Sequence, residues 1–99
     1  MSDVIVHVIA RGRVQGVGYR AFVEREAVKR GLEGWVRNRR DGTVEAVFKG
    51  APATVEEVIE ACERGPFTAK VEGLNRRDGV IADLKSRLPG QGFSVLATL

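Results

Sequence analysis

The chain has 99 residues, of which 43% are hydrophobic and 29% charged, with one cysteine and a formal net charge of +3. This composition predicts one compact domain over residues 1–99 whose core needs no disulfide, and it excludes both a disulfide framework and a cysteine-based metal site within the chain. The charge bias is too weak to imply nucleic acid, no segment has the length of a membrane span, and the lack of a visible secretory signal favours the cytoplasm.

The first predicted element is an interior strand. Residues 4–11 alternate with a period of two and place apolar side chains on both faces. A helical period follows from about Tyr19 to Arg30, and Gly31 fits the C-terminal end of that helix. The chain is therefore expected to start with a strand and a helix joined by a short loop.

A β-hairpin is predicted next. GWVRNR, residues 34–39, has the composition of a strand, and TVEAVFK, residues 43–49, has that of the returning strand. Asp41 and Gly42 between them are typical of a tight hairpin turn.

The second predicted helix has clear signals at both ends. Thr54 and Glu57 have the spacing of a capping box, and Gly65-Pro66 is expected to end the helix. Four apolar residues at helical spacing form one stripe between these ends: Val55, Val58, Ile59 and Cys62.

Two further strands complete the chain. AKVEGLN, residues 69–75, and FSVLATL, residues 93–99, have the composition of strands. The resulting order is βαββαβ plus a final strand. Two such units joined by short hairpins predict a ferredoxin-like α+β sandwich, with an antiparallel sheet and both helices on one face.

The pentapeptide NRRDG occurs twice, starting at Asn38 and at Asn75, a shift of 37 residues. The predicted fold has internal pseudo-symmetry, so this shift superposes its two halves. Both copies are therefore expected at equivalent strand ends, and the residues around each copy can be compared.

The first half has the features of an anion site. In GRVQGVGYR, residues 12–20, Gly16 and Gly18 allow a tight turn that brings successive N–H groups onto one concave surface. The loop leads directly into a helix, so free N–H groups and the positive end of the helix dipole point to the same place. Phosphate suits such a site, and Arg20 can add a two-pronged contact.

The second half lacks this anion site. A proline without an N–H, two residues other than glycine and an acidic side chain replace the key positions of the first half: Pro52 for Gln15, Ala53 for Gly16, Val55 for Gly18 and Glu57 for Arg20. Asn75 is accordingly expected to be structural.

Glycine-rich turns between strand and helix are common, so this spacing alone leaves a purely structural loop open. Two other phosphate motifs do not fit. The dinucleotide fingerprint lacks its third glycine, and no Gly-Lys-Ser/Thr follows for a Walker-type loop.

Two blocks, GRVQGVGYR and GWVRNRRDGTVE, closely resemble the acylphosphatase family. The resemblance covers nearly the whole chain and includes GPFTAKVEG and the phenylalanine that opens the last strand. Residues 81–92 have no confident match. Tyr19 stands where the family often has phenylalanine.

The resemblance implies the ferredoxin-like fold and hydrolysis of the carboxyl-phosphate anhydride of acyl phosphates, with no metal and no cofactor. It implies that Arg20 binds phosphate and that Asn38 positions the attacking water. The cradle implied by the resemblance is the backbone of five residues: Gln15, Gly16, Val17, Gly18 and Tyr19. An amide cannot act as a base, so our hypothesis is that a phosphate oxygen of the substrate takes the water's proton.

Other polar and aromatic residues are given structural roles. His7 lies in the middle of a strand, and Cys62 is expected to be a small buried hydrophobe. Trp35 and Phe48 are expected in the core, and Asp41 in its turn. The arginine cluster of residues 37, 39 and 40 is typical of a solvated hairpin end, although it could steer anionic substrates.

Two other functions remain open. A non-catalytic accessory domain that binds acyl phosphates would keep the same residues. An RNA-binding module of the same fold is disfavoured, because TVEAVFKG has one phenylalanine and a glutamate where such a surface stacks bases. A monomer that acts on a small acyl phosphate, without nucleic acid or membrane, is the expectation. The sequence does not indicate which acyl phosphate.

Overall fold

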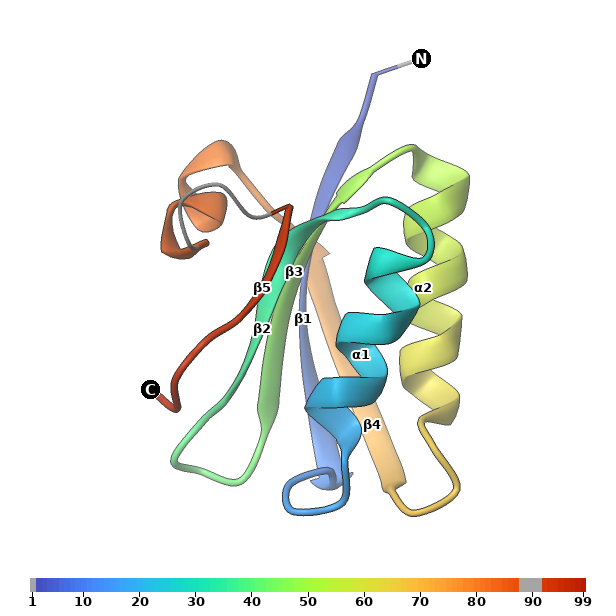
Figure 1. Ribbon diagram of the computed structural model, residues 1–99, viewed down its shortest axis with the longest axis vertical. Helices are drawn as coiled ribbons and strands as arrows, with labels where there is room; N and C mark the ends of the chain where they lie inside the picture. The colour runs from blue at the N-terminus through green and yellow to red at the C-terminus, as the bar shows by residue number, and fades with distance from the viewer. Residues whose placement is uncertain (1, 88–91) are drawn as a thin grey trace.

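The computed structural model describes residues 2–87 and 92–99 as one twisted sheet that carries α1 and α2 on the same face (Figure 1). The elements in chain order are β1 (Val4–Arg13), α1 (Tyr19–Val28), β2 (Glu33–Asn38), β3 (Val44–Gly50), α2 (Pro52–Arg64), β4 (Lys70–Asp78), the 3-10 helix η1 (Ile81–Ser86) and β5 (Phe93–Val95). The predicted ferredoxin-like α+β class is confirmed. Part of the segment that had no confident match, residues 88–91, lies outside the described residues.

The sheet has the strand order β4-β1-β3-β2-β5. β1 pairs antiparallel with both β3 and β4, which confirms it as an interior strand, and β2 pairs antiparallel with β3. β5 instead pairs parallel with β2, so the sheet is mixed where the sequence predicted an antiparallel one. The chain leaves β4 at one edge and reaches the opposite edge through η1, which is a crossover and not a hairpin.

The main core lies between the sheet and the two α-helices. Phe48 and Val36 enter it from the sheet, Val23 from α1, and Val58 and Cys62 from α2. Each of these side chains is buried, because the apolar stripe of each helix faces the apolar face of the sheet. The core positions predicted for Phe48 and Cys62 are confirmed.

A smaller cluster lies on the opposite face of the sheet. Trp35 is buried there against Val47 and Leu84, the latter from η1. The indole Nε1 of Trp35 donates a hydrogen bond of 2.6 Å to the carbonyl oxygen of Asp83. Trp35 is therefore a core residue as predicted, and η1 is the element that covers it.

The second NRRDG copy is not a turn. Asn75 pairs with Ile9 and Asp78 with Val6, so the copy is extended within β4. The first copy does turn, because the N–H of Gly42 donates to the carbonyl oxygen of Arg39 at 3.1 Å. The prediction of equivalent strand ends is wrong. β4 pairs with the long strand β1 and therefore continues through the second copy, whereas β2 pairs with the shorter β3 and ends at Asn38.

The predicted capping box of the second helix is also wrong. α2 begins at Pro52, with Ala51 as its N-cap and no side-chain cap, so Thr54 and Glu57 already lie inside the helix. A proline at the first helical position is favourable because its missing N–H is not needed there. The predicted end at Gly65 is confirmed. The last strand spans three residues and not seven.

Candidate active site

The loop between β1 and α1, residues 14–18, has a backbone that needs its glycines. Gly16 has φ +72° and Gly18, the N-cap of α1, has φ +81°. A Cβ built on either residue meets nothing within 4 Å. A side chain would therefore have room at both positions. Glycine is favoured there because the backbone is left-handed.

This loop presents unused hydrogen-bond donors. Within residues 2–87 and 92–99, the N–H groups of Gly16, Val17 and Gly18 donate to no protein acceptor. The first backbone bond of α1 runs from the N–H of Phe22 to the carbonyl oxygen of Gly18, at 3.0 Å. The N–H groups before it are free in the first helical turn, where the helix dipole is positive. The loop can therefore hold an anion.

Side chains anchor this loop at several points. Thr68 Oγ1 donates to the carbonyl oxygen of Val17 at 2.7 Å, and Val14 is buried. The hydroxyl of Tyr19 donates to the carbonyl oxygen of Cys62 at 2.7 Å, with the Tyr19 side chain buried beneath α1. Only the backbone of Tyr19 is therefore available to a ligand.

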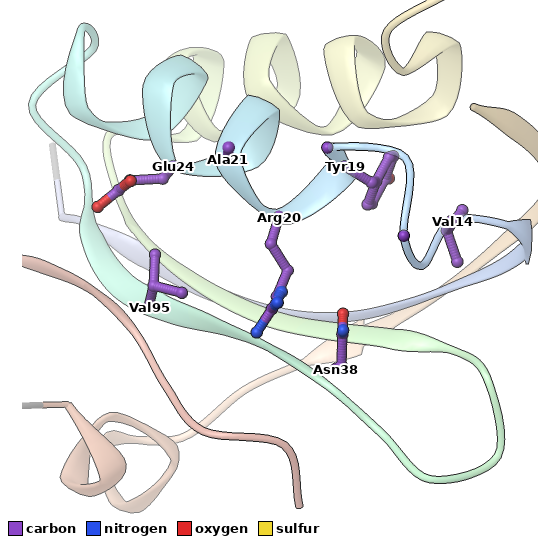
Figure 2. A pocket seen from close by; sticks show the side chains of 9 residues that line it. Val14, Tyr19, Arg20, Ala21, Glu24, Asn38 and Val95 are labelled. Carbon is purple, nitrogen blue, oxygen red and sulfur yellow. The ribbon is translucent and has the colours of Figure 1, made fainter. Parts of the chain in front are cut away.

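Arg20 and Asn38 lie on opposite walls of one pocket. Figure 2 shows Arg20 extending from the first turn of α1 toward the sheet, where Asn38 points up from the end of β2. The pocket has a volume of about 450 Å³. It is lined by Val14, Gly16, Gly18, Tyr19, Arg20, Ala21, Glu24, Asn38 and Val95. The two predicted site residues and the glycine loop are thus brought together.

The side-chain amide of Asn38 has an unmet hydrogen-bonding need. Its Oδ1 is buried and has no hydrogen-bond partner among the described residues. Buried polar atoms are satisfied in the great majority of cases, often by water, so this oxygen is available to accept a hydrogen bond from a water or a ligand. Asn38 can accept a hydrogen bond from a water held beside the loop.

Three hydrogen bonds to the backbone around Asn38, two from Gln15 and one from Leu99, were not predicted from the sequence. The side chain of Gln15 donates to the carbonyl oxygens of Arg39 and Thr43, at 2.7 and 2.8 Å. The N–H of Leu99 donates to the carbonyl oxygen of Asn38 at 3.1 Å. A long amide directly before the glycines is the signal that could have indicated Gln15, and no local signal indicates Leu99.

Residues 37, 41 and 45 do not line the pocket. Arg37 Nε donates to Glu45 Oε1 at 2.8 Å, and its guanidinium lies 4.6 Å from the centre of the Trp35 ring, on the face of the sheet away from the helices. His7 Nε2 lies 2.7 Å from Glu45 Oε2. This contact with Glu45 is consistent with the structural role expected for His7. Asp41 Oδ1 accepts bonds from the N–H and hydroxyl of Thr43, which is a turn role.

The burial of Cys62 argues against a nucleophile. Burial is the main cause that raises the pKa of its thiol to about 12, and the side chain has 1% of its surface exposed. The thiol is therefore protonated at neutral pH, and a thiolate is needed for attack.

The corresponding part of the second half offers no such loop. Residues 52, 53 and 55, which take the places of Gln15 and the two glycines, lie within α2. Asn75 is exposed, and its Oδ1 accepts a 2.9 Å hydrogen bond from Arg11 Nε. The two asparagines of the NRRDG copies therefore have different surroundings.

Among the described residues, no group of three or more His, Cys, Asp or Glu side chains is arranged to hold a metal ion. No helix in the described part of the chain combines the length and apolarity that crossing a membrane requires.

Comparison with known proteins agrees with the geometry. The family model described as Acylphosphatase matches residues 6–88. An acylphosphatase of Rhodopseudomonas palustris (strain BisB18) is 54% identical over 99 residues, which cover 100% of both chains, and one of Bradyrhizobium diazoefficiens is 50% identical over the same span. The crystal structure of acylphosphatase from Bacillus subtilis has a TM-score of 0.80 at 37% identity, covering 94% of this chain and 98% of that one. The resemblance seen in the sequence motifs is confirmed, and the chain belongs to the acylphosphatase family of enzymes.

Proposed function

We propose that the chain hydrolyses acyl phosphates with the pocket between α1 and the end of β2. In this proposal the backbone of residues 15–19 and the guanidinium of Arg20 hold the phosphoryl group, and Asn38 orients the attacking water. The observation that carries the proposal is the meeting of Arg20 and Asn38 at the glycine loop in one pocket.

Binding of the phosphoryl group uses donors that the protein leaves free. The N–H groups of residues 16–18 have no acceptor among the described residues, and Gly16 and Gly18 line the pocket at the positive end of α1. Arg20 adds a planar fork of donors from the adjacent first turn. Because these groups are fixed before the substrate arrives, they stabilise charge on the phosphoryl oxygens without reorganising.

The reaction needs little more than positioning. The oxygen of the water attacks phosphorus, and the bond between phosphorus and the bridging oxygen breaks. The acyl carboxylate leaves with the electron pair of that bond. The proton of the water passes to a phosphoryl oxygen, so the products are a carboxylate and inorganic phosphate. A carboxylate is a good leaving group, so no separate acid is required to protonate it.

Asn38 serves as a guide for the water and not as a base. An amide is neutral and can both accept and donate hydrogen bonds. The buried, unpartnered Oδ1 can accept a bond from the water and so direct its lone pair toward phosphorus. No metal and no cofactor takes part in this scheme.

The test is hydrolysis of benzoyl phosphate, followed by absorbance, in the presence of a metal chelator. Wild type is compared with Asn38→Ala and with Asn75→Ala as the matched control. We expect Asn38→Ala to lower kcat by about 100-fold or more, with Asn75→Ala close to wild type. Equal losses in the two variants would contradict the assignment of Asn38. An inactive, folded wild type that still binds phosphate would favour the accessory domain.

The same proposal includes a single domain over residues 1–99 that works as a monomer in the cytoplasm, without nucleic acid. A free, buried cysteine suits a reducing compartment. Light scattering of the purified protein at several concentrations tests the monomer, because a dimer would double the mass.

A further inference from the structure

The side chain of Gln15 bridges two parts of the candidate site. Its Nε2 donates to the carbonyl oxygen of Arg39 at 2.7 Å and to that of Thr43 at 2.8 Å. Both hydrogens of one amide nitrogen are therefore used on residues 24 and 28 positions away along the chain. Both bonds are partly buried, so water competes weakly for them.

The hairpin turn does not need Gln15 in order to close. The N–H of Arg39 donates to the carbonyl oxygen of Thr43 at 2.9 Å, and the N–H of Gly42 donates to that of Arg39 at 3.1 Å. Each carbonyl oxygen thus already accepts one backbone hydrogen bond, and Gln15 supplies a second. The two bonds from Gln15 add a direct link between this turn and the loop that follows β1.

The two ends of this bridge are next to the two functional groups. Gln15 directly precedes Gly16, the first glycine of the cradle, and Arg39 directly follows Asn38. The cradle extends from β1 into α1, whereas Asn38 ends β2, so no backbone segment joins them directly. The Gln15 side chain therefore links the loop of phosphate-holding N–H groups directly to the backbone beside the amide that would orient water.

We propose that Gln15 is a positioning residue for hydrolysis, which acts by fixing Asn38 relative to the cradle. This proposal rests on the proposed roles of the cradle and Asn38. The accuracy of such an arrangement matters, because a displacement of about 1 Å can lower a rate about 100-fold. In this role the side chain of Gln15 acts on the turn and not on the reacting atoms, whereas its backbone belongs to the cradle.

The first variant is Gln15→Met, which keeps the length of the side chain and removes both donors. Neither carbonyl oxygen is left without a hydrogen bond in this variant, since Arg39 and Gly42 still donate to them. We expect kcat to fall about 10- to 100-fold, while the competitive inhibition constant of inorganic phosphate stays within about threefold of wild type. The shorter Gln15→Asn, which keeps an amide but loses its reach, should give a similar loss.

The decisive measurement is a double-mutant cycle. If Gln15 acts through Asn38, then Gln15→Met in an Asn38→Ala background should change kcat by less than about twofold. The control is Asn75→Leu. This variant removes the 2.9 Å hydrogen bond between Arg11 and the Asn75 side chain, away from the candidate site, and should leave kcat unchanged. Circular dichroism confirms that each variant is folded.

The possible results separate this inference from the proposed function. A folded Gln15→Met enzyme with the kcat of wild type, while Asn38→Ala is impaired, would overturn the inference alone. Losses that multiply in the double variant, or a loss confined to phosphate affinity, would also overturn it. Wild-type activity in Asn38→Ala would overturn both.

Discussion

The N–H of Leu99 donates a 3.1 Å hydrogen bond to the carbonyl oxygen of Asn38, which joins the C-terminal segment to the residue proposed to orient water. The segment reaches this position along β2, where the N–H of Leu96 donates to the carbonyl oxygen of Val36 at 2.9 Å. Asn38 lies at the last position of β2, where the ladder to β3 ends. The bond from Leu99 therefore supports the backbone of Asn38 on the side away from β3.

Replacing Leu99 by proline should reduce turnover, because proline has no N–H to donate. We expect kcat for benzoyl phosphate to fall about threefold to tenfold, since a bond of this kind contributes about 1 kcal/mol. Leu99→Ala keeps the N–H and is the matched control for loss of the side chain. A Leu99→Ala enzyme as slow as Leu99→Pro would show that the side chain, and not the N–H, is what matters.

Substitution of Arg20 should affect both substrate binding and turnover. Its guanidinium is expected to contact the phosphoryl group in the ground state and in the transition state, so Arg20→Ala should lower kcat/KM by at least about 100- to 1000-fold. Arg20→Lys keeps the positive charge without the fork of donors and should recover part of this loss. Steady-state kinetics and inhibition by inorganic phosphate measure the two effects separately. Unchanged phosphate inhibition in Arg20→Ala would contradict the binding role.

The fold was largely predictable because its signals are local. The stripe of apolar residues in α2 and the Asp41-Gly42 turn lie in short segments, and both were identified. The length of β4 and the direction of β5 were not, since each depends on the strand that lies beside it. The capping box was misplaced because a proline two residues earlier begins the helix first.

The parts of the candidate site that lie within short sequence motifs could be predicted from the sequence. Arg20 and the glycines are neighbours in sequence. Comparing the two halves of the chain at a shift of 37 residues showed that only the copy of NRRDG with Asn38 accompanies a glycine loop and an arginine. The contacts of Gln15 and Leu99 join segments that are distant along the chain. Their partners are backbone carbonyls, which exist at every residue, so the amide before the glycines could have indicated Gln15 but no sequence pattern indicates which carbonyls these residues reach.

The glycines of the cradle give a prediction with an internal control. Gly16 and Gly31 have nearly the same φ, +72° and +70°, and neither has an atom within 4 Å of a built Cβ. Alanine at either position should therefore cost a similar free energy of unfolding, about 1 to 2 kcal/mol. Only Gly16→Ala should also weaken inhibition by inorganic phosphate, because Gly31 lies at the far end of α1. Equal phosphate inhibition in both variants would contradict the cradle.

The hydrogen bonds that Glu45 accepts from His7 and Arg37 should make stability depend on pH. Glu45 lies between His7 and Arg37, with 12% of its side chain exposed. Burial alone would raise the pKa of this carboxyl, but the hydrogen bonds from His7 and Arg37 outweigh it and hold the pKa below its ordinary value of 4.5. The folded state therefore binds fewer protons than the unfolded state in this range. The stabilisation is present above the unfolded pKa and is lost as the pH falls through the folded pKa.

We accordingly expect Glu45→Gln to be less stable than wild type at pH 7, with a difference that narrows as the pH falls below 4.5. Urea unfolding at a series of pH values measures that difference. Glu60→Gln is the control, because Glu60 is exposed on α2 and its side chain forms no ion pair among the described residues. Its stability should follow wild type at every pH. A difference between Glu45→Gln and wild type that stays constant from neutral to acid pH would mean that the carboxylate charge of Glu45 contributes nothing, and that only the shape of the side chain is needed between His7 and Arg37.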